Sequence, residues 1–135
     1  MLIKKSLPSL WCLGLLCASA LQAAQPADPC AAAKTTIEIN ECMSQQFVAV
    51  DRELNRAYQD LLKRIDANDP QHVDRTTVRR RLIEAQRSWV EFRKQDCDGM
   101  YKLFEGGSIR NARYHGCMIE RTERRIVELK GWDQP

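Results

Sequence analysis

The sequence predicts an all-α fold, an antiparallel three-helix bundle with two long helices and a shorter third, stapled by two disulfides. Three observations lead to this prediction. Apolar residues recur at spacings of three and four in three separate segments, as on the buried face of amphipathic helices. Short runs of turn-forming residues separate those segments. An N-terminal segment typical of export leaves four cysteines in the rest of the chain, an even number that favours disulfides.

Residues 1–24 have the three parts of a secretory signal peptide. Two lysines precede an apolar run over about residues 7–21, and small residues follow it. The run is shorter than the roughly 20 apolar residues of a membrane-spanning helix, so no stable membrane anchor is expected. Cleavage is expected between Ala20 and Ala24. The chain then consists of a signal peptide and a single helical domain over residues 25–135, located in the periplasm or secreted.

The first helix is expected from about Thr36 to Asp66. Thr35, followed by Glu38 three residues later, has the pattern of a capping box, in which each side chain accepts a hydrogen bond from the other residue's backbone N–H. The apolar positions that should face the other helices are Met43, Phe47, Val50, Leu54, Tyr58, Leu61 and Ile65.

The second long helix is expected to start at Pro70 or Arg75 and to end at Leu103. A turn precedes it, in which Asp69 is a candidate N-cap and Pro70 a candidate first residue. The apolar positions along this segment are Val78, Leu82, Ala85, Trp89, Phe92, Met100 and Phe104.

A second break lies at residues 105–108, where two glycines favour the end of a helix. Ser108 is a candidate N-cap for a third, shorter helix that ends near Gly131. Trp132 follows and is expected to fold back onto the bundle. The apolar face of the third helix consists of Ile119, Thr122, Ile126 and Leu129.

The four cysteines outside the signal peptide are Cys30, Cys42, Cys97 and Cys117. Cys97 and Cys117 lie at nearly equal distances from the second break, so antiparallel helices bring them level. We therefore expect Cys97 to pair with Cys117, and Cys30 to pair with Cys42. Counted from the first turn, Cys42 also lies level with Cys97, so a Cys42–Cys97 bridge remains the competing pairing.

Charge and motif content exclude several function classes. Removal of the two signal-peptide lysines lowers the formal net charge from +3 to +1, which argues against nucleic-acid binding. The chain has only two histidines, His72 and His115, and no nucleophile, phosphate-loop or zinc-spacing motif. We therefore expect a protein that is not an enzyme, with no catalytic residues, cofactor or metal. The oligomeric state is left open.

Five residues near the apolar faces of the long helices are interpreted as a structural polar network: Asp51, Asn55, Gln86, Trp89 and Arg93. Gln86 and Arg93 flank Trp89 at spacings of three and four, so these three share one helix face. Arg93 is expected to pair with Asp51 while its stem packs on Trp89. The alternative is that these residues line a polar binding groove.

The second break and its flanks form the candidate partner-binding site. The alternative is that it only caps two helices. In the binding interpretation an exposed loop enters a partner's cleft, with nearby aromatic residues as anchors. Asp96, Asp98 and Glu105 would add a local acidic patch. The residues assigned to this site are Tyr101, Phe104, Glu105, Gly106, Gly107, Ser108 and Tyr114.

An ordered set of motifs extends over about residues 28–130. It comprises Cys30 and Cys42 with Thr36, Glu38 and Asn40 between them, Asp51-x-x-Leu54-Asn55-x-x-Tyr58, Leu82-x-x-x-Gln86-x-x-Trp89-x-x-x-Arg93-x-x-x-Cys97, Gly106-Gly107-Ser108, and Cys117 with Thr122, Arg125 and Leu129. The set resembles the LprI-type family of small exported bacterial helical proteins, long catalogued as a domain of unknown function. The resemblance implies a helical fold with four paired cysteines.

The family's name comes from a mycobacterial lipoprotein described as a lysozyme inhibitor. The resemblance therefore implies an exported periplasmic lysozyme inhibitor that acts by protein–protein binding. The alternative is an envelope interaction module that binds another envelope protein and has no inhibitory or catalytic activity. Cys17 is preceded by Leu16 instead of a small residue, so the lipid anchor of the namesake is not expected here.

Overall fold

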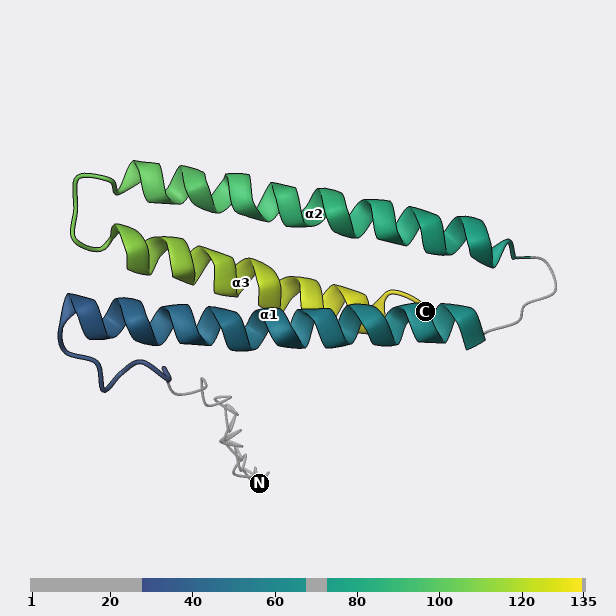
Figure 1. Cartoon of the computed structure of the whole chain (residues 1–135), viewed down its shortest axis with the longest axis horizontal. Helices are drawn as coiled ribbons and strands as arrows, with labels where there is room; N and C mark the ends of the chain where they lie inside the picture. The colour runs from purple at the N-terminus through teal and green to yellow at the C-terminus, as the bar shows by residue number, and fades with distance from the viewer. Residues whose placement is uncertain (1–27, 68–72, 135) are drawn as a thin grey trace, which may run out of the picture.

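The computed structural model describes residues 28–67 and 73–134, and the predicted signal peptide lies outside them. Helices account for 81% of the described residues, and no strand occurs among them. The all-α class and all three predicted helices are confirmed. The helices are α1 (Thr36–Ala67), α2 (Arg75–Leu103) and α3 (Arg110–Gly131), shown in Figure 1.

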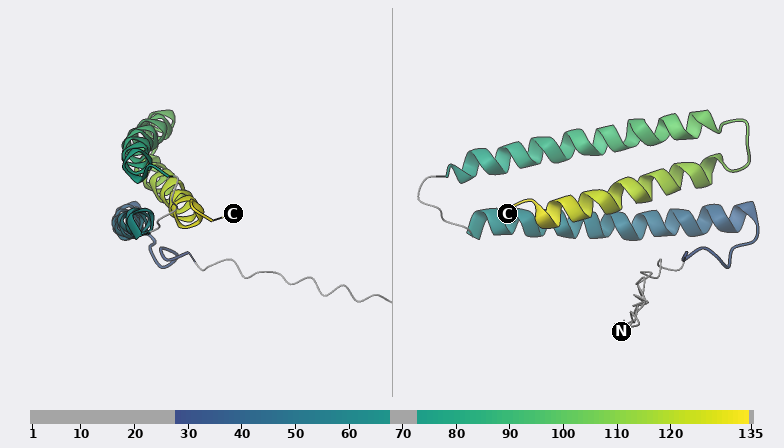
Figure 2. Two further views of the ribbon diagram at one scale, coloured as in Figure 1. Left: turned by 90° about the vertical axis from the view of Figure 1, so that its right-hand side faces the viewer. Right: turned by 180° about the vertical axis from the view of Figure 1, so that it is seen from behind.

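The three helices run alternately in opposite directions, so α1 and α3 are parallel and α2 is antiparallel to both (Figures 1 and 2). The shortest helix, α3, packs along both long helices, whereas α1 and α2 contact each other least. α3 therefore joins the two long helices into one unit. None of the helices in the described part of the chain is long and apolar enough to cross a membrane.

The start of α1 is set by the predicted capping box. Thr35 Oγ1 accepts a hydrogen bond from the Glu38 N–H at 3.2 Å, and the Glu38 carboxylate accepts one from the Thr35 N–H at 2.9 Å. The Lys34 N–H also donates to this carboxylate at 2.9 Å. These backbone donors lower the pKa of Glu38 below its usual value, and the Lys34 N–H has the largest effect.

The start of α2 is set by Asp74. Its carboxylate accepts a hydrogen bond from the Thr77 N–H at 3.0 Å, and the helix begins at Arg75. Arg75 was the second of the two predicted starts. The other candidates, Asp69 as cap and Pro70 as first residue, lie outside the described residues.

The predicted Ser108 cap of α3 is wrong. Ile109 occupies the N-cap position, α3 begins at Arg110, and no side chain in the described chain caps its first turn. The Ile109 carbonyl instead accepts the hydrogen bond of the Arg113 N–H at 2.9 Å. Ser108 lies one residue too early for its hydroxyl to reach the free N–H groups of the helix.

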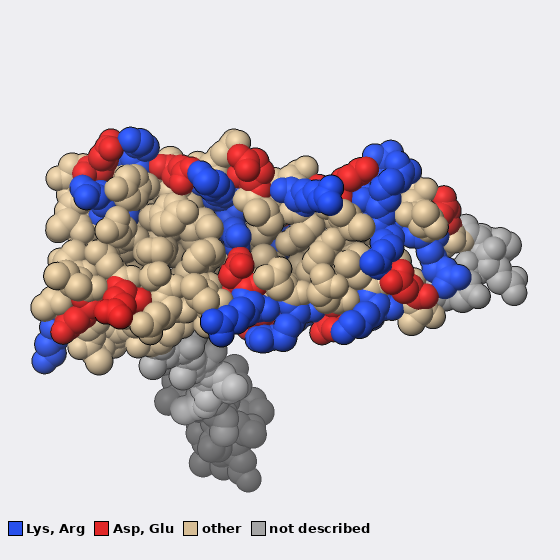
Figure 3. Space-filling model, in the orientation of Figure 1, with Lys and Arg blue, Asp and Glu red and all other residues tan. Residues whose placement is uncertain are grey.

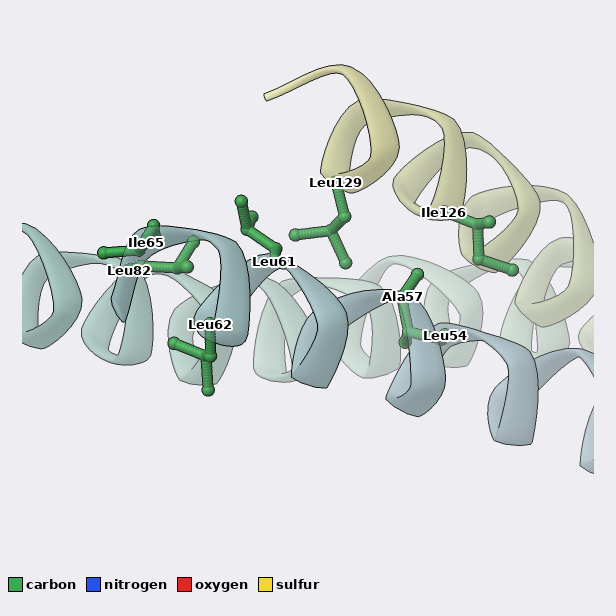
Figure 4. Packing of buried hydrophobic residues seen from close by; sticks show 8 residues of the cluster. All are labelled: Leu54, Ala57, Leu61, Leu62, Ile65, Leu82, Ile126 and Leu129. Carbon is green, nitrogen blue, oxygen red and sulfur yellow. The ribbon is translucent and has the colours of Figure 1, made fainter. Parts of the chain in front are cut away.

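The larger core cluster lies at the end of the bundle where α1 ends and α2 begins. Figure 4 shows Ile126 and Leu129 pointing from α3 toward α1. Each fully buried aliphatic side chain contributes about 1.5–3 kcal/mol to stability. The buried members are Leu54, Ala57, Leu61, Leu62, Ile65, Leu82, Ile126 and Leu129.

Three predicted apolar positions of α2 do not join the core. Phe92 is 56% exposed, and Ala85 and Met100 are also exposed. α2 faces inward along a narrow stripe that includes Leu82 and Arg93. Phe92 lies one residue before Arg93, about 100° around the helix from it, and so points away from the bundle.

Two disulfides join Cys30 to Cys42 and Cys97 to Cys117, with Cα–Cα distances of 5.8 and 5.6 Å. The preferred pairing is confirmed, and the competing Cys42–Cys97 bridge is wrong. Cys97 and Cys117 belong to a second, smaller buried cluster with Met118, against which Phe47 and Tyr114 pack.

The chain end after α3 is held against α1. Asp133 accepts hydrogen bonds from the Arg64 guanidinium at 2.9 and 3.0 Å. Trp132 lies near Ile65 and Val78, where these side chains line one hollow, yet it remains 48% exposed. The predicted folding back of Trp132 therefore covers only part of the indole.

Candidate functional site

The α2–α3 turn is closed by its own backbone. The Phe104 N–H donates to the Tyr101 carbonyl at 3.2 Å, and the Gly107 N–H donates to the Phe104 carbonyl at 2.9 Å. The Cys97–Cys117 disulfide links the two helices behind the turn. The turn is therefore a short, cross-linked segment at one end of the bundle (Figure 1).

The structure brings two of the three predicted aromatic residues of the site into contact. Tyr101 and Tyr114 meet edge to face, with ring centroids 6.3 Å apart. The Arg110 guanidinium lies 5.8 Å from the Tyr101 ring centroid, and the Arg113 guanidinium lies 5.1 Å from that of Phe104. These contacts engage the rings within the chain, so they stabilise the turn more than they offer free anchors.

The most exposed apolar side chains beside the turn are Leu103 and Ile109, which are 76% and 46% exposed. Leu103 precedes the turn and Ile109 follows it, so both flank it at the surface. Neither was among the predicted site residues. Leu103 could have been recognised from the sequence, because it lies at the end of α2 and outside the row of positions that face the bundle. Exposed apolar groups on a rigid support are typical of protein-binding surfaces.

A hollow of about 500 Å³, here called the turn hollow, lies next to these residues. Its walls include Met43 of α1, Met100 of α2, Gly116 of α3 and Ile109 just before α3. A Cβ atom at residue 116 would lie 3.3 Å from the Met43 Cε. Glycine therefore allows Met43 to lie close against α3. A glycine inside a helix, where it is unfavourable, was the available signal for this contact.

The carboxylates of the predicted acidic patch are all engaged by basic side chains. The Lys102 hydrogen bond lowers the pKa of Glu105. Near the end of the bundle where α1 begins, Figure 3 shows a broad central surface without charged side chains. The patch therefore offers little free negative charge. The ion pairs are Lys102–Glu105 at 2.8 Å, Arg121–Asp96 at 2.8 Å and Lys94–Asp98 at 2.5 Å.

A layer of polar contacts crosses the interior of the bundle. One Arg93 Nη donates to the Asp51 carboxylate at 2.8 Å and to Thr122 Oγ1 at 2.7 Å. The Arg93 guanidinium lies 5.3 Å from the Phe47 ring centroid and 5.0 Å from that of Trp89. Arg93 is buried, so its guanidinium is not accessible to a ligand, as it would be in an open polar groove.

Gln86 and Arg125 extend this layer toward the outside. Arg125 Nε donates to Gln86 Oε1 at 3.1 Å, and the Arg125 guanidinium lies 5.7 Å from the Trp89 ring centroid. Arg125 was not predicted to belong to the network. Asn55 was predicted to belong to the network, but it is exposed and makes no hydrogen bond to any residue that the structure describes. Asn55 follows buried Leu54 directly, and this one step turns its side chain about 100° away.

One group of side chains has the geometry of a metal site, but its chemistry does not fit. Within the described residues, ligand atoms of Asp96, Cys97 and Cys117 lie within 4.8 Å of one another. Both sulfurs belong to a disulfide, and the carboxylate binds Arg121. Cysteine binds a metal as a free thiolate, so neither sulfur of the disulfide can act as a ligand here.

Comparison with known proteins finds one matching family and two similar bacterial proteins. The family described as "Lysozyme inhibitor LprI" matches residues 27–129. The chain is 31% identical over 120 residues to "Uncharacterized protein R02472" of Rhizobium meliloti, covering 86% of each protein. It is 26% identical over 103 residues to "Uncharacterized protein YecT" of Escherichia coli, covering 68% of this chain and 60% of that protein. No solved structure matches the chain significantly.

Proposed function

The chain belongs to the family of the lysozyme inhibitor LprI, and we propose that it is an exported, non-catalytic protein that binds and inhibits lysozyme. The two disulfides support a location outside the cytoplasm, since structural disulfides persist in oxidising compartments. The proposal assigns the binding surface to the α2–α3 turn and its flanks.

The observation that carries this assignment is the exposure of Leu103 and Ile109 on a cross-linked turn. A binding loop that is rigid before contact loses little conformational entropy on binding. The Cys97–Cys117 disulfide and the edge-to-face contact of Tyr101 with Tyr114 provide that rigidity. Leu103 and Ile109 would then be the side chains buried by the partner, with Glu105 to Ser108 between them.

An inhibition assay on the oxidised protein tests the proposal. The protein is produced with its own N-terminal segment, and c-, g- and i-type lysozymes are assayed on cell-wall substrate at low and moderate salt. The expected result is dose-dependent inhibition of at least one class at near-stoichiometric concentration. Absence of inhibition of every class at large molar excess would overturn the proposal.

Two variants and a matched control locate the surface. Leu103→Asp and Ile109→Asp are each expected to raise the half-inhibitory concentration about tenfold or more, as loss of an interface anchor does. Val127→Asp introduces the same charge at an apolar side chain of α3 that is also well exposed but remote from the turn. Inhibition by the Val127 variant should match the wild type.

A second candidate function, an envelope interaction module without inhibitory activity, is favoured by the ion-paired carboxylates near the turn. An acidic surface would accelerate association with a strongly basic lysozyme, and Asp96, Asp98 and Glu105 are already neutralised. This candidate predicts that no lysozyme is inhibited. It also predicts that a pull-down with the wild-type protein captures a periplasmic protein that the Leu103→Asp variant does not capture.

A further inference from the structure

A second hollow, here called the loop hollow, lies between the segment before α1 and the helices α1 and α3. Its volume is about 430 Å³, within the range of sites that bind small molecules or side chains. Its apolar walls include Pro29 and Ala33 of the segment, Ile39 and Met43 of α1, and Ile119 of α3. Figure 2 shows the segment before α1 folded back beneath that helix.

The loop hollow is formed by the fold itself. The Cys30–Cys42 disulfide ties the segment to α1, and the Asp28 carboxylate accepts a hydrogen bond from the Cys30 N–H at 2.8 Å. The close approach of Met43 to Gly116 brings α1 against α3 on the other side. A cross-linked wall of this kind is preformed, so an occupant would not have to order it.

Two carboxylates, Asp28 and Glu123, also line the loop hollow. Glu123 forms no hydrogen bond or ion pair with any described residue, whereas its neighbours Glu120 and Glu128 on α3 are paired with arginines. Among the described residues, no lysine or arginine lines the loop hollow beside these two carboxylates. Its described wall therefore carries negative charge and no basic side chain.

We propose that the loop hollow receives a lysine or arginine side chain of a basic partner protein. The aliphatic stem of such a side chain packs on the apolar walls, while its cationic end binds Glu123 and approaches Asp28. Glu123 is exposed at the rim of the loop hollow, where a cationic end can pair with it and a neutral apolar occupant cannot. The combination of apolar walls and free carboxylates therefore selects a cationic side chain.

The position of the loop hollow links it to the α2–α3 turn. Met43 and Gly116 line both the loop hollow and the turn hollow, so the two are neighbours across this contact. One partner surface would therefore cover the turn and also insert a basic side chain. This inference rests on the proposed function, under which the partner is lysozyme, but the charge of the site is independent of the turn residues.

Charge substitutions test the site on the protein itself. Glu123→Gln and Glu123→Arg are compared with Glu91→Gln, which removes the same charge from an exposed position on α2 that does not line the loop hollow. Calorimetric titration with the inhibited lysozyme should give affinity about fivefold to tenfold weaker for Glu123→Gln and weaker still for Glu123→Arg. Affinity should change less than about twofold for Glu91→Gln, as at a peripheral charge.

A second readout does not depend on lysozyme. N-acetyl-arginine amide and its neutral isostere N-acetyl-citrulline amide are titrated into methyl-labelled protein, and the signals of Met43 and Ile119 are followed by NMR. The arginine compound should shift these signals in the wild type and much less in Glu123→Gln. The citrulline compound should have little effect.

The outcomes separate the two proposals. Equal shifts from both compounds, or none from the arginine compound at millimolar concentration, would overturn the loop-hollow proposal, as would lysozyme affinity that is equal in Glu123→Arg and Glu91→Gln. Inhibition would still support the proposed function in that case. Arginine-specific shifts without any lysozyme binding would support the hollow and overturn lysozyme as the partner.

Discussion

Arg93 is the residue at which all three helices meet. Its guanidinium comes from α2, binds Asp51 of α1 and Thr122 of α3, and is enclosed by the rings of Phe47 and Trp89. Thr122 in turn donates to the backbone of its own helix at 2.6 Å. A buried cation that lies between two apolar clusters aligns the helices, because any shift along their axes separates it from its partners.

Substitution of Arg93 by alanine should lower the free energy of unfolding by about 3 kcal/mol, the lower end for a broken buried ion pair. The lower value applies because the Asp51 side chain is 34% exposed, so water hydrates its carboxylate when the Arg93 guanidinium is removed. Arg87→Ala, at an exposed position of the same helix, should change stability by less than about 0.5 kcal/mol. Urea denaturation of both variants measures this difference, and equal stabilities would contradict the role of Arg93.

His115 makes the stability of the protein depend on pH. Its Nδ1 is buried without a hydrogen-bond partner in the described residues, and burial lowers the pKa of His115 below 6.5. The unfolded chain therefore binds a proton at a higher pH than the folded chain does. The contribution of His115 to stability is complete above the unfolded pKa of about 6.5 and is lost as the pH falls below it through the lower folded pKa.

In His115→Gln this decrease should be absent, because the titrating group is gone. Wild-type protein measured in parallel provides the reference slope. Chemical denaturation at a series of pH values measures both. A slope that persists unchanged in the His115 variant would show that burial of this imidazole is not its cause.

Among the elements, α1 and α2 have local start signals and α3 does not. The Thr35–Glu38 capping box was predictable because both partners lie within one turn of the chain. Asp74 caps α2 in the same local way, although Asp69 had the same pattern in the sequence. The start of α3 depends on how the chain leaves the turn, and the Ser108 prediction failed for that reason.

The Cys97–Cys117 disulfide compensates for the weak start of α3. It closes a loop over a sequence separation of 20 residues, which stabilises a protein by about 3 kcal/mol in the chain-entropy model. Joint replacement of both cysteines by alanine should lower the free energy of unfolding by that amount. It should also reduce protection of the turn amides from hydrogen exchange.

Joint replacement of Cys30 and Cys42 by alanine is the control for this prediction. That pair encloses a shorter segment, with a sequence separation of 12, so its removal should cost slightly less. It should leave the turn amides protected. A loss below about 1 kcal/mol for the Cys97–Cys117 pair, or equal turn protection in both variants, would contradict the role given to this disulfide.

At the scale of the whole molecule, aliphatic packing and the candidate binding surfaces are concentrated in different parts. The larger core joins the second halves of α1 and α3, while the turn and the turn hollow lie at the end with the smaller cluster of Cys97, Cys117 and Met118. Substitutions on the exposed surface at that end should therefore alter binding before they alter stability. This separation is what makes the variants at Leu103, Ile109 and Glu123 informative.

The helical class, the three helices, the preferred cysteine pairing and the Arg93–Asp51 contact could be predicted from the sequence. These features follow from periodicity and from distances counted along helices of known rise, which are local quantities. The approximate location of the candidate turn was likewise set by its glycines.

Which apolar residues remain exposed, and which charges pair across helices, depends on tertiary packing. Phe92 belongs to a periodic pattern yet points outward, because α2 is covered along a narrow stripe only. Asp96 of α2 is paired with Arg121 of α3 because these helices pack together, whereas Asp98 and Glu105 pair with lysines three or four residues away along the chain. The contact between Met43 and Gly116 is likewise a product of the α1–α3 interface, since exposure and pairing are properties of packed surfaces and not of the chain alone.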